Sequence, residues 1–334
     1  MHDLAVSTSP RARSVDAHLD MLVNLLAAAE RRGAAAGVVP DLLAERVLRA
    51  FDAFIHVFDA ELRALSAGEA RDVGGHVRAT LMPWLRRSDN ARRWIDKPRG
   101  YAGDYLTIAQ IYDGVASGDG PVGALIDRCF LGLPAARAVV NRRALVAREI
   151  RATQRRCADR TARVASFACG PARELFDVFE AALDPLEATL VDFDDQALTY
   201  CATERDLLDV GTSVQLMPAN LIHAALGRRT LALAPQDLIY SIGLIDYFED
   251  PLVVKLLDLI HDKLAPGGRV VLGNFHPRNP TKAMLDHVLD WSLIHRTEDD
   301  MNRLFRASKF DAGCLRVRYE PLGINLFAEG VKRA

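Results

Sequence analysis

Residues 163–195 read RVASFACGPARELFDVFEAALDPLEATLVDFDD, and this stretch decides the fold. A short apolar run, RVASFA, leads into small residues around Gly170, and a helical pattern starts at Ala172. A second apolar run, ATLVDFD, follows the helical pattern. Apolar runs of this length, bounded by turn residues, suit buried strands. The stretch therefore predicts a strand, a helix and a second strand that lies parallel to the first.

The same alternation continues to residue 275. The apolar runs SVQLM, DLIYSI and RVVLGNF follow in order, with helical patterns from Asp195 and over residues 251–263. A longer helical stretch is expected over residues 281–307, and the later runs CLRVRYEPL and NLFAEGVK are close enough to pair as an antiparallel hairpin. We therefore predict an α/β domain over residues 159–334, in which a parallel sheet with right-handed crossovers carries a terminal antiparallel hairpin.

The turn after the first strand has a small residue at every second position. Ala168, Gly170 and Ala172 alternate with larger side chains. A tight strand-to-helix turn needs backbone freedom, and a side chain larger than methyl would keep a ligand away from the main chain. The pattern indicates a cofactor-binding turn. The alternative is that this segment merely joins a strand to a helix.

Acidic residues mark the end of the second strand. Asp192 stands where a carboxylate can accept hydrogen bonds from both ribose hydroxyls of an adenosine group. Asp194 and Asp195 follow it, and the alternative for this pair is to cap the next helix, a role that suits Asp195 better. Asn220, just after the third strand, is a candidate adenine contact.

These signals, in this order, resemble class I methyltransferases, which have a Rossmann-like sheet and use S-adenosyl-L-methionine. The turn at Pro266 and Gly267 before the fifth strand belongs to the same pattern. At the end of the fourth strand, the resemblance implies that Asp246 and Tyr247 point toward the methyl acceptor. It implies the following cofactor-binding set in the α/β domain, with Ser241 and Ile242 lining the methionine part: Ala168, Gly170, Ala172, Glu174, Asp192, Asp194, Asn220, Ser241 and Ile242.

The earlier part of the chain lacks alternating strand and helix signals. Residues 1–16, rich in Ser, Pro and Arg, are expected to form a disordered arm. Residues 17–158 predict a helical N-terminal domain, because apolar residues recur at intervals of three and four over residues 42–65. A second helix is expected over residues 72–85, although its glycines and proline weaken that prediction. A third is expected over residues 135–156.

Within the helical domain, residues 96–105 read DKPRGYAGDY. Together with the cofactor turn and with DWSLIHR at 290–296, this loop resembles bacterial methyltransferases that make 3-hydroxy fatty acid methyl ester signals, and related fatty-acid O-methyltransferases. We expect this loop to fold as a lid over the cofactor, because Tyr101 and Tyr105 would otherwise be exposed aromatic residues on a mobile loop. Arg99 or Lys97 would lie near the methionine carboxylate, and Tyr101 near the sulfonium or the acceptor. The alternative is an interdomain connector whose charges are solvated.

The same resemblance implies an acceptor that carries a carboxylate. Arg296, expected in a helix, would pair with that carboxylate, whereas Trp291 suits the core better than the site. An ionised carboxylate needs no base. If the acceptor were a phenol or an amine, Asp246, His276 or His295 would be the candidate bases. The expected catalytic set is Tyr101, Asp246, Tyr247 and Arg296.

Other activities compete with methyl-ester formation. N-methylation or phenolic O-methylation of a specialised metabolite would use the same cofactor, and a sensor would bind the cofactor without turnover. An NAD-dependent oxidoreductase is disfavoured, because the G-x-G-x-x-G spacing is missing and the terminal hairpin does not belong to that fold.

The composition limits the classes of binding partner that we expect. The 42 basic and 44 acidic residues give a net charge of -2, which offers no bulk attraction for nucleic acid or anionic lipid. The five cysteines show no metal-ligand spacing, and no apolar stretch approaches the roughly 20 residues of a membrane span. Arginine far outnumbers lysine, as in bacteria with GC-rich genomes. We expect a cytoplasmic bacterial enzyme that uses S-adenosyl-L-methionine, a small-molecule acceptor and no metal, with a homodimer left open.

Overall fold

The computed structural model describes residues 9–181 and 185–333, which fall into two compact units. The first unit holds Met1–Arg137 and Asn279–Ser292, and the second holds Ala138–Arg278 and Leu293–Ala334. This division differs from the predicted boundary after residue 158. The cause is helix α7 (Pro134–Arg156), whose apolar face packs on the sheet of the second unit from residue 145 onward.

Helices build the first unit. Their bounds are α1 (Pro10–Ala36), α2 (Asp41–Leu62), α3 (Ala67–Leu85), α4 (Asp89–Asp96), α5 (Tyr105–Asp113), α6 (Gly120–Leu131) and the π-helix η2 (Met284–Val288). The predicted helices over residues 42–65 and 72–85 correspond to α2 and α3. Across the described ranges, the structure contains no helix with the length and apolar character needed to cross a membrane.

Helix α1 begins at Pro10, so the prediction of a disordered arm is wrong over residues 10–16. Residues 1–8 lie outside the described part of the chain. The Ser9 side chain accepts a hydrogen bond from the Ala12 N–H (3.1 Å), and proline suits the first turn of a helix. Ala12 and Val15 are fully buried. The Ser-Pro pair therefore acts as a helix start.

Helix α3 begins earlier than predicted because a capping box between Ser66 and Glu69 starts it. Gly74 lies inside this helix for a packing reason. A Cβ at Gly74 would lie 2.6 Å from the His287 side chain of η2. Glycine lowers the helix propensity at this position, but it allows two segments of the first unit to approach each other closely.

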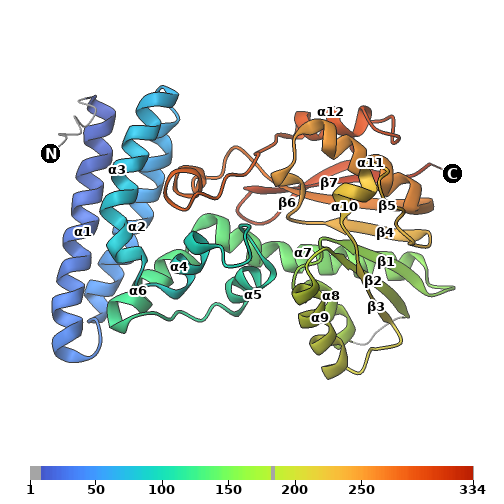
Figure 1. Cartoon of the computed structure of the whole chain (residues 1–334), viewed down its shortest axis with the longest axis horizontal. Coiled ribbons are helices and arrows are strands. Elements are labelled where there is room, and N and C mark those ends of the chain that lie inside the picture. The colour runs from blue at the N-terminus through green and yellow to red at the C-terminus, as the bar shows by residue number, and fades with distance from the viewer. Residues whose placement is uncertain (1–8, 182–184, 334) are drawn as a thin grey trace. The chain divides into compact units, whose positions relative to one another are not determined.

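The second unit contains one seven-stranded sheet in the order β3-β2-β1-β4-β5-β7-β6 (Figure 1). Strands β1 to β5 are parallel, whereas β7 pairs antiparallel with both β5 and β6. The predicted α/β fold and terminal hairpin are confirmed. The strands are β1 (Ala162–Phe167), β2 (Leu186–Asp192), β3 (Val214–Pro218), β4 (Gln236–Ser241), β5 (Leu264–Phe275), β6 (Arg316–Tyr319) and β7 (Asn325–Val331).

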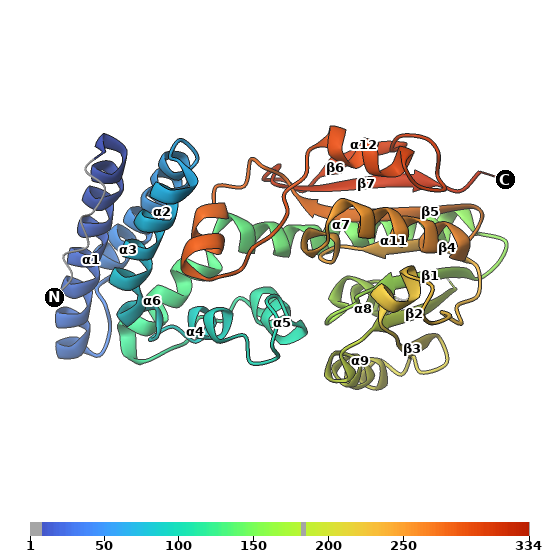
Figure 2. The same cartoon turned by 45° about the horizontal axis from the view of Figure 1, so that its top comes forward.

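Helices cover both faces of this sheet. One face packs against α7, α8 (Arg173–Glu180) and α9 (Asp195–Leu207), and the other against α10 (Leu221–Ala225), α11 (Asp250–Lys263) and α12 (Glu298–Arg306). Figure 2 shows α7 and α11 on opposite sides of the strands. Neighbouring strand residues alternate between the two cores, as Leu238 and Ile239 do. Burial on both faces explains why the strands read as continuous apolar runs.

The helical stretch predicted over residues 281–307 is wrong in its middle. The π-helix η2 ends at Val288, and α12 begins only at Glu298. Between them, the Ile294 N–H donates to the Asp246 carbonyl (2.7 Å) and the Arg296 N–H donates to the Phe275 carbonyl (2.9 Å). These bonds satisfy the backbone of residues 293–296 without a helix, so this segment runs across the carboxyl ends of β4 and β5.

A buried ionic cluster attaches α7 to the sheet. The Arg269 guanidinium on β5 lies 3.2 Å from a Glu149 carboxylate oxygen on α7 and 2.7 Å from one of Glu329 on β7. It also donates to the Thr153 hydroxyl (3.2 Å). All of these side chains are almost fully buried. Arg316 and Arg318 on β6 also pair with these carboxylates from more exposed positions, so Arg269 is the cation that is buried between them. Its removal would leave the inner oxygens of Glu149 and Glu329 without their buried partner.

We predict that Arg269→Met lowers the free energy of unfolding by about 3 kcal/mol or more, because Glu149 and Glu329 lose their shared buried partner. Urea unfolding followed by circular dichroism measures the loss. The matched control is Arg163→Met, which breaks an exposed pair with Glu187 and should cost less than about 1 kcal/mol. Equal losses in the two variants would contradict this account of the cluster.

Candidate active site

The turn between β1 and α8 has an unusual backbone. Ala168, Gly170 and Ala172 have φ angles of 53°, 53° and 48°, in the left-handed region that glycine adopts freely and that any residue with a Cβ, alanine included, adopts at a cost. A Cβ at Gly170 would meet nothing within 4 Å, so the space beside this glycine is open. Ala172 is fully buried, so it is Gly170 that leaves room for a ligand to reach the main chain.

The Asp192 carboxylate, at the end of β2, is tied to this turn. One of its oxygens accepts a hydrogen bond from the Gly170 N–H (3.0 Å), and the other accepts from the Asp194 N–H (3.0 Å). Burial raises the pKa of Asp192, while these backbone donors lower it. Each carboxylate oxygen keeps a further acceptor site. The group can thus hold the turn and still accept a hydroxyl from a ribose.

The two candidate residues beside Asp192 have helix-capping roles. The Asp194 side chain caps α9 by accepting from the Gln196 N–H (3.0 Å), so the capping role assigned to Asp195 is wrong. Asn220 caps α10 by accepting from the His223 N–H (3.0 Å). Both residues nevertheless lie at the carboxyl edge of the sheet, where parallel α/β sheets bind their ligands.

The end of β4 is joined to β1 and α8. The Ser241 hydroxyl donates to the Phe167 carbonyl (2.8 Å), and the Tyr240 hydroxyl donates to a Glu174 carboxylate oxygen (2.9 Å). Burial raises the pKa of Glu174, which is 2% exposed. Ile242 packs into the core beneath α8. These contacts fix the relative positions of the two strand ends on which the expected cofactor site depends.

On the acceptor side, Asp246 and Tyr247 lie in the 3-10 helix η1 (Ile245–Tyr247), directly after β4. Asp246 is buried and accepts a hydrogen bond from the Phe275 N–H at the end of β5 (2.7 Å). Desolvation raises the pKa of Asp246 to about 6. Tyr247 is 40% exposed. The structure therefore brings a buried carboxyl group and an accessible phenol to the same edge.

Arg296 cannot act as the cation that binds the acceptor, contrary to the prediction. Its Nε and one Nη donate to the Asp250 carboxylate (3.1 and 2.9 Å), and that Nη also donates to the Phe248 carbonyl (2.5 Å). The other Nη donates to the Ile245 carbonyl (2.8 Å) and the Asn274 side chain (3.0 Å). A guanidinium has five N–H donors, and all five are used. Arg296 instead fixes the loop after β4.

The predicted lid loop belongs to the first unit, between α4 and α5. Lys97 forms an ion pair with Asp290 (2.9 Å), so its ammonium has a partner within that unit. At the other end of the loop, Asp104 caps α5 and pairs with Arg93 (2.6 Å). The roles of Arg99 and Tyr101 toward a cofactor stay predictions. Trp291 is buried against Trp94, with ring centroids 5.8 Å apart, which confirms its place in the core.

Sequence reasoning missed Arg142, a buried residue on α7. The available signal was its helical spacing, because Arg142 stands on the buried face with Ala138, Leu145 and Glu149. A charged residue on such a face needs a partner. Residue spacing shows which side of the helix it occupies, but it does not show what lies opposite.

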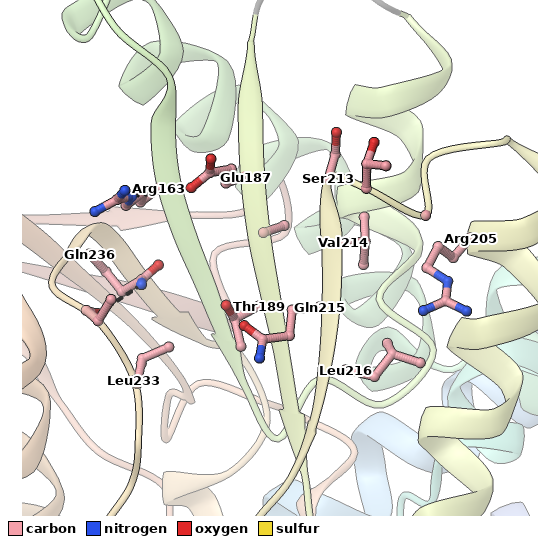
Figure 3. Close-up of a pocket in the computed structure, with 14 residues that line it drawn as sticks. Arg163, Glu187, Thr189, Arg205, Ser213, Val214, Gln215, Leu216, Leu233 and Gln236 are labelled. Carbon is pink, nitrogen blue, oxygen red and sulfur yellow. Dashed lines mark hydrogen bonds and ion pairs between the residues drawn. The ribbon is translucent and has the colours of Figure 1, made fainter.

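A cavity of about 550 Å³ lies elsewhere in the second unit (Figure 3). Its lining includes Glu187 and Val214 at the amino ends of β2 and β3, with Thr189 and Gln215 on the strands themselves. Gly170 follows the carboxyl end of β1, and Asp192 is the last residue of β2. The cavity therefore lies at the opposite edge of the sheet from the candidate active site.

We predict that Asp246→Asn removes a pH-dependent loss of stability. The folded pKa of about 6 exceeds the unfolded value of about 3.9, so the contribution of Asp246 is fully present below about pH 4 and lost as the pH rises through about 6. At pH 7 the variant should be more stable by about 3 kcal/mol, since one pKa unit corresponds to about 1.4 kcal/mol.

Urea unfolding of both proteins between pH 4 and pH 7 measures this difference. The matched control is Asp299→Asn, which places the same change on an exposed side chain. A stability difference between wild type and Asp246→Asn that stays constant over this pH range would show that the Asp246 carboxyl does not titrate there.

Comparison with known proteins identifies the family. A family model described as "Putative methyltransferase" matches residues 100–327. Among solved structures, a possible exported protein from Bordetella parapertussis has a TM-score of 0.62 at 18% identity, covering 87% of this chain and 97% of that chain. At this identity the likeness is one of fold. No curated protein matches the chain.

Two further solved structures have lower TM-scores. Magnesium protoporphyrin IX methyltransferase from Synechocystis PCC 6803, with bound S-adenosylhomocysteine, has 12% identity and a TM-score of 0.45, covering 60% of this chain and 87% of that chain. The 1,6-didemethyltoxoflavin-N1-methyltransferase from Burkholderia thailandensis has 19% identity and a TM-score of 0.42, covering 56% and 78%. The family model spans more than half of the chain, including every strand of the sheet except the end of β7. The chain therefore belongs to this family of methyltransferases.

Proposed function

We propose that this enzyme transfers the methyl group of S-adenosyl-L-methionine to the carboxylate of a small apolar acid, such as a fatty acid, and releases a methyl ester and S-adenosylhomocysteine. The observation that carries the proposal is the surroundings of two candidate bases. Both ring nitrogens of His276 are engaged, because Nδ1 accepts from the Arg278 N–H (3.0 Å) and from its Nε (3.2 Å) and Nε2 lies 3.3 Å from a Glu298 carboxylate oxygen. Asp246 is 2% exposed and accepts from the Phe275 N–H. An acceptor that brings its own negative charge needs neither of them.

The chemistry fits a site that positions the acceptor and does not activate it with a base. When bound, the cofactor supplies a methyl group on a sulfonium, which is an excellent leaving group. Asp192 and the turn at Gly170 would hold the adenosine part, and Ser241 and Ile242 would flank the methionine part. Alignment of the acceptor and exclusion of water then do most of the work. The resemblance of residues 96–105 and 290–296 to fatty-acid O-methyltransferases supports an apolar acid.

Several finer assignments belong to the same proposal. The loop at residues 96–105 would act as a lid, with Arg99 and Tyr101 toward the cofactor, and Tyr247 would face the acceptor. Glu174 would support the turn from α8. A cytoplasmic location and a homodimer stay predictions.

One observation favours a second candidate function, N-methylation or phenolic O-methylation. The His295 Nδ1 lies 3.0 Å from the Leu293 carbonyl oxygen. A carbonyl only accepts, so Nδ1 must carry the ring proton and Nε2 holds the lone pair. That tautomer is the one a general base needs. His295 follows Ile294, which is hydrogen-bonded to the Asp246 carbonyl, and its ring lies 6.0 Å from that of Phe275.

We predict that incubation with methyl-labelled S-adenosyl-L-methionine and a panel of apolar acids transfers the label to an acid. Mass spectrometry should identify a methyl ester, and mild alkali should remove the label because esters hydrolyse. The control panel contains the matching amines and phenols. An alkali-stable label on one of these compounds would replace the carboxylate proposal with the second function and make His295 the residue to vary.

We predict that Asp192→Asn weakens binding of S-adenosylhomocysteine by about 2 kcal/mol, roughly 30-fold, because an amide nitrogen in place of one carboxylate oxygen cannot accept from Gly170 or from a ribose hydroxyl. Isothermal titration calorimetry measures the affinity. The matched control is Asp195→Asn in the same acidic run, which should bind as the wild type does. Unchanged affinity in Asp192→Asn would remove Asp192 from the cofactor site.

A further inference from the structure

Arg142 is a buried arginine that has no hydrogen-bond or ion-pair partner in the part of the chain that the structure describes. Its relative exposure is 6%, and its Nε is fully enclosed. Among the described residues, none forms a hydrogen bond or an ion pair of 4 Å or less with its guanidinium. The other buried arginines of the second unit, Arg269 and Arg296, have carboxylate partners at 2.7 to 3.2 Å. Arg142 is the exception among them.

Such a side chain is costly unless an anion pairs with it. A guanidinium stays charged at any pH relevant to proteins, so it cannot avoid the cost by losing its proton. Taking an unpaired ion out of water costs several kcal/mol, even after relaxation of its surroundings. The packing of α7 therefore maintains a buried cation whose N–H donors meet no acceptor among the described residues. A ligand with negative charge would supply the missing partner.

The position of Arg142 points to the active site. A Cβ at Gly243 would lie 3.4 Å from both Nη atoms of Arg142 and 3.8 Å from Cζ, so the fork of the guanidinium faces this glycine. Gly243 is exposed and follows Ser241 and Ile242 at the carboxyl end of β4. The missing side chain at residue 243 leaves the fork accessible from the edge where the cofactor and the acceptor meet.

Two buried carboxyl groups lie close enough to feel the charge of Arg142. That charge lowers the pKa of Glu174 and of Asp246, against the larger effect of desolvation. Each of these carboxyl groups has a partner of its own, the Tyr240 hydroxyl and the Phe275 N–H respectively. They therefore screen Arg142 without satisfying its donors.

We propose that Arg142 is the carboxylate-binding cation of the active site, a role that the sequence predictions gave to Arg296 for the acceptor and to Arg99 or Lys97 for the cofactor. The inference rests on the proposed function, because that function supplies two ligands that carry a carboxylate: the methionine part of the cofactor and the acceptor acid. The guanidinium fork matches the two oxygens of a carboxylate in a bidentate pair. Glu174 and Asp246 disfavour an anion of higher charge, such as a phosphate.

The surrounding charges favour the cofactor as the source of this carboxylate. The amino-acid part of S-adenosyl-L-methionine carries one carboxylate, one ammonium and one sulfonium. The site presents one guanidinium with two carboxyl groups, Glu174 and Asp246, which is the opposite set of charges. Binding of the two cationic groups would also stabilise the ionised forms of these buried carboxyl groups.

The test compares two ligands on the full chain. S-adenosylhomocysteine carries the amino-acid carboxylate, and 5′-methylthioadenosine has the same nucleoside and thioether without it. In Arg142→Met, calorimetry should show at least a tenfold loss of affinity for S-adenosylhomocysteine and no loss for 5′-methylthioadenosine. If Arg142 binds the carboxylate of the acceptor acid instead, both nucleoside affinities stay unchanged in Arg142→Met. KM for the acid then rises at least tenfold while kcat changes little.

Two further variants separate this role from a structural one. Arg148→Met makes the same change at an exposed position of α7 and should alter none of these quantities. Arg142→Lys keeps the charge beside Glu174 and Asp246 but removes the fork, so its affinity for S-adenosylhomocysteine should fall selectively, by less than in Arg142→Met. If Arg142→Met does not fold, Arg142→Lys still tests the proposal. Unchanged affinities and an unchanged KM in both Arg142 variants, or an equal loss for both nucleosides, would overturn the proposal. A wild-type protein that binds neither nucleoside would instead reject the proposed function.

Discussion

The hydrogen bond that the Asp192 carboxylate accepts from the Gly170 N–H connects the end of β2 to the cofactor turn after β1, while the other carboxylate oxygen accepts from the Asp194 N–H. Strand β1 ends in a backbone with alternating left-handed residues, which has little stability of its own. A buried carboxylate from β2 satisfies the N–H in the middle of that turn. The Ser241 hydroxyl holds the end of β4 to the same strand. The positions of the expected cofactor contacts therefore depend on one another.

This arrangement explains why several predicted site residues have structural partners as well. Asp192, Asp194 and Ser241 each bind main-chain groups, and Glu174 accepts from Tyr240. A parallel strand leaves main-chain groups unpaired at its carboxyl end, and nearby side chains must satisfy them if they are buried. The residues at this edge thus maintain an open backbone surface beside Gly170, and that surface is what a ligand can use.

The two buried arginines of this edge show that what an arginine can bind depends on how many of its N–H donors already have acceptors. Arg296 has all five donors occupied and holds the loop after β4 against the segment before α12. Arg142 has the same side chain and a similar degree of burial, but the chain provides no acceptor for it within the described residues. One arginine therefore stabilises the fold, whereas the other is available to a ligand with negative charge.

The sequence by itself determined the α/β class of the second unit, the succession of its strands and helices along the chain, the terminal hairpin and the small-residue turn. These features follow from local rules, namely apolar runs between turn residues and the small side chains of Ala168, Gly170 and Ala172. Only the tertiary structure decided which arginine is occupied, because the acceptors of Arg296 are carbonyl groups and side chains 22 to 51 residues away in the chain. Every residue except proline carries the same main-chain donor and acceptor, so residue type does not reveal which carbonyl a distant guanidinium will meet. That pairing arises only when β4, β5 and the segment before α12 come together.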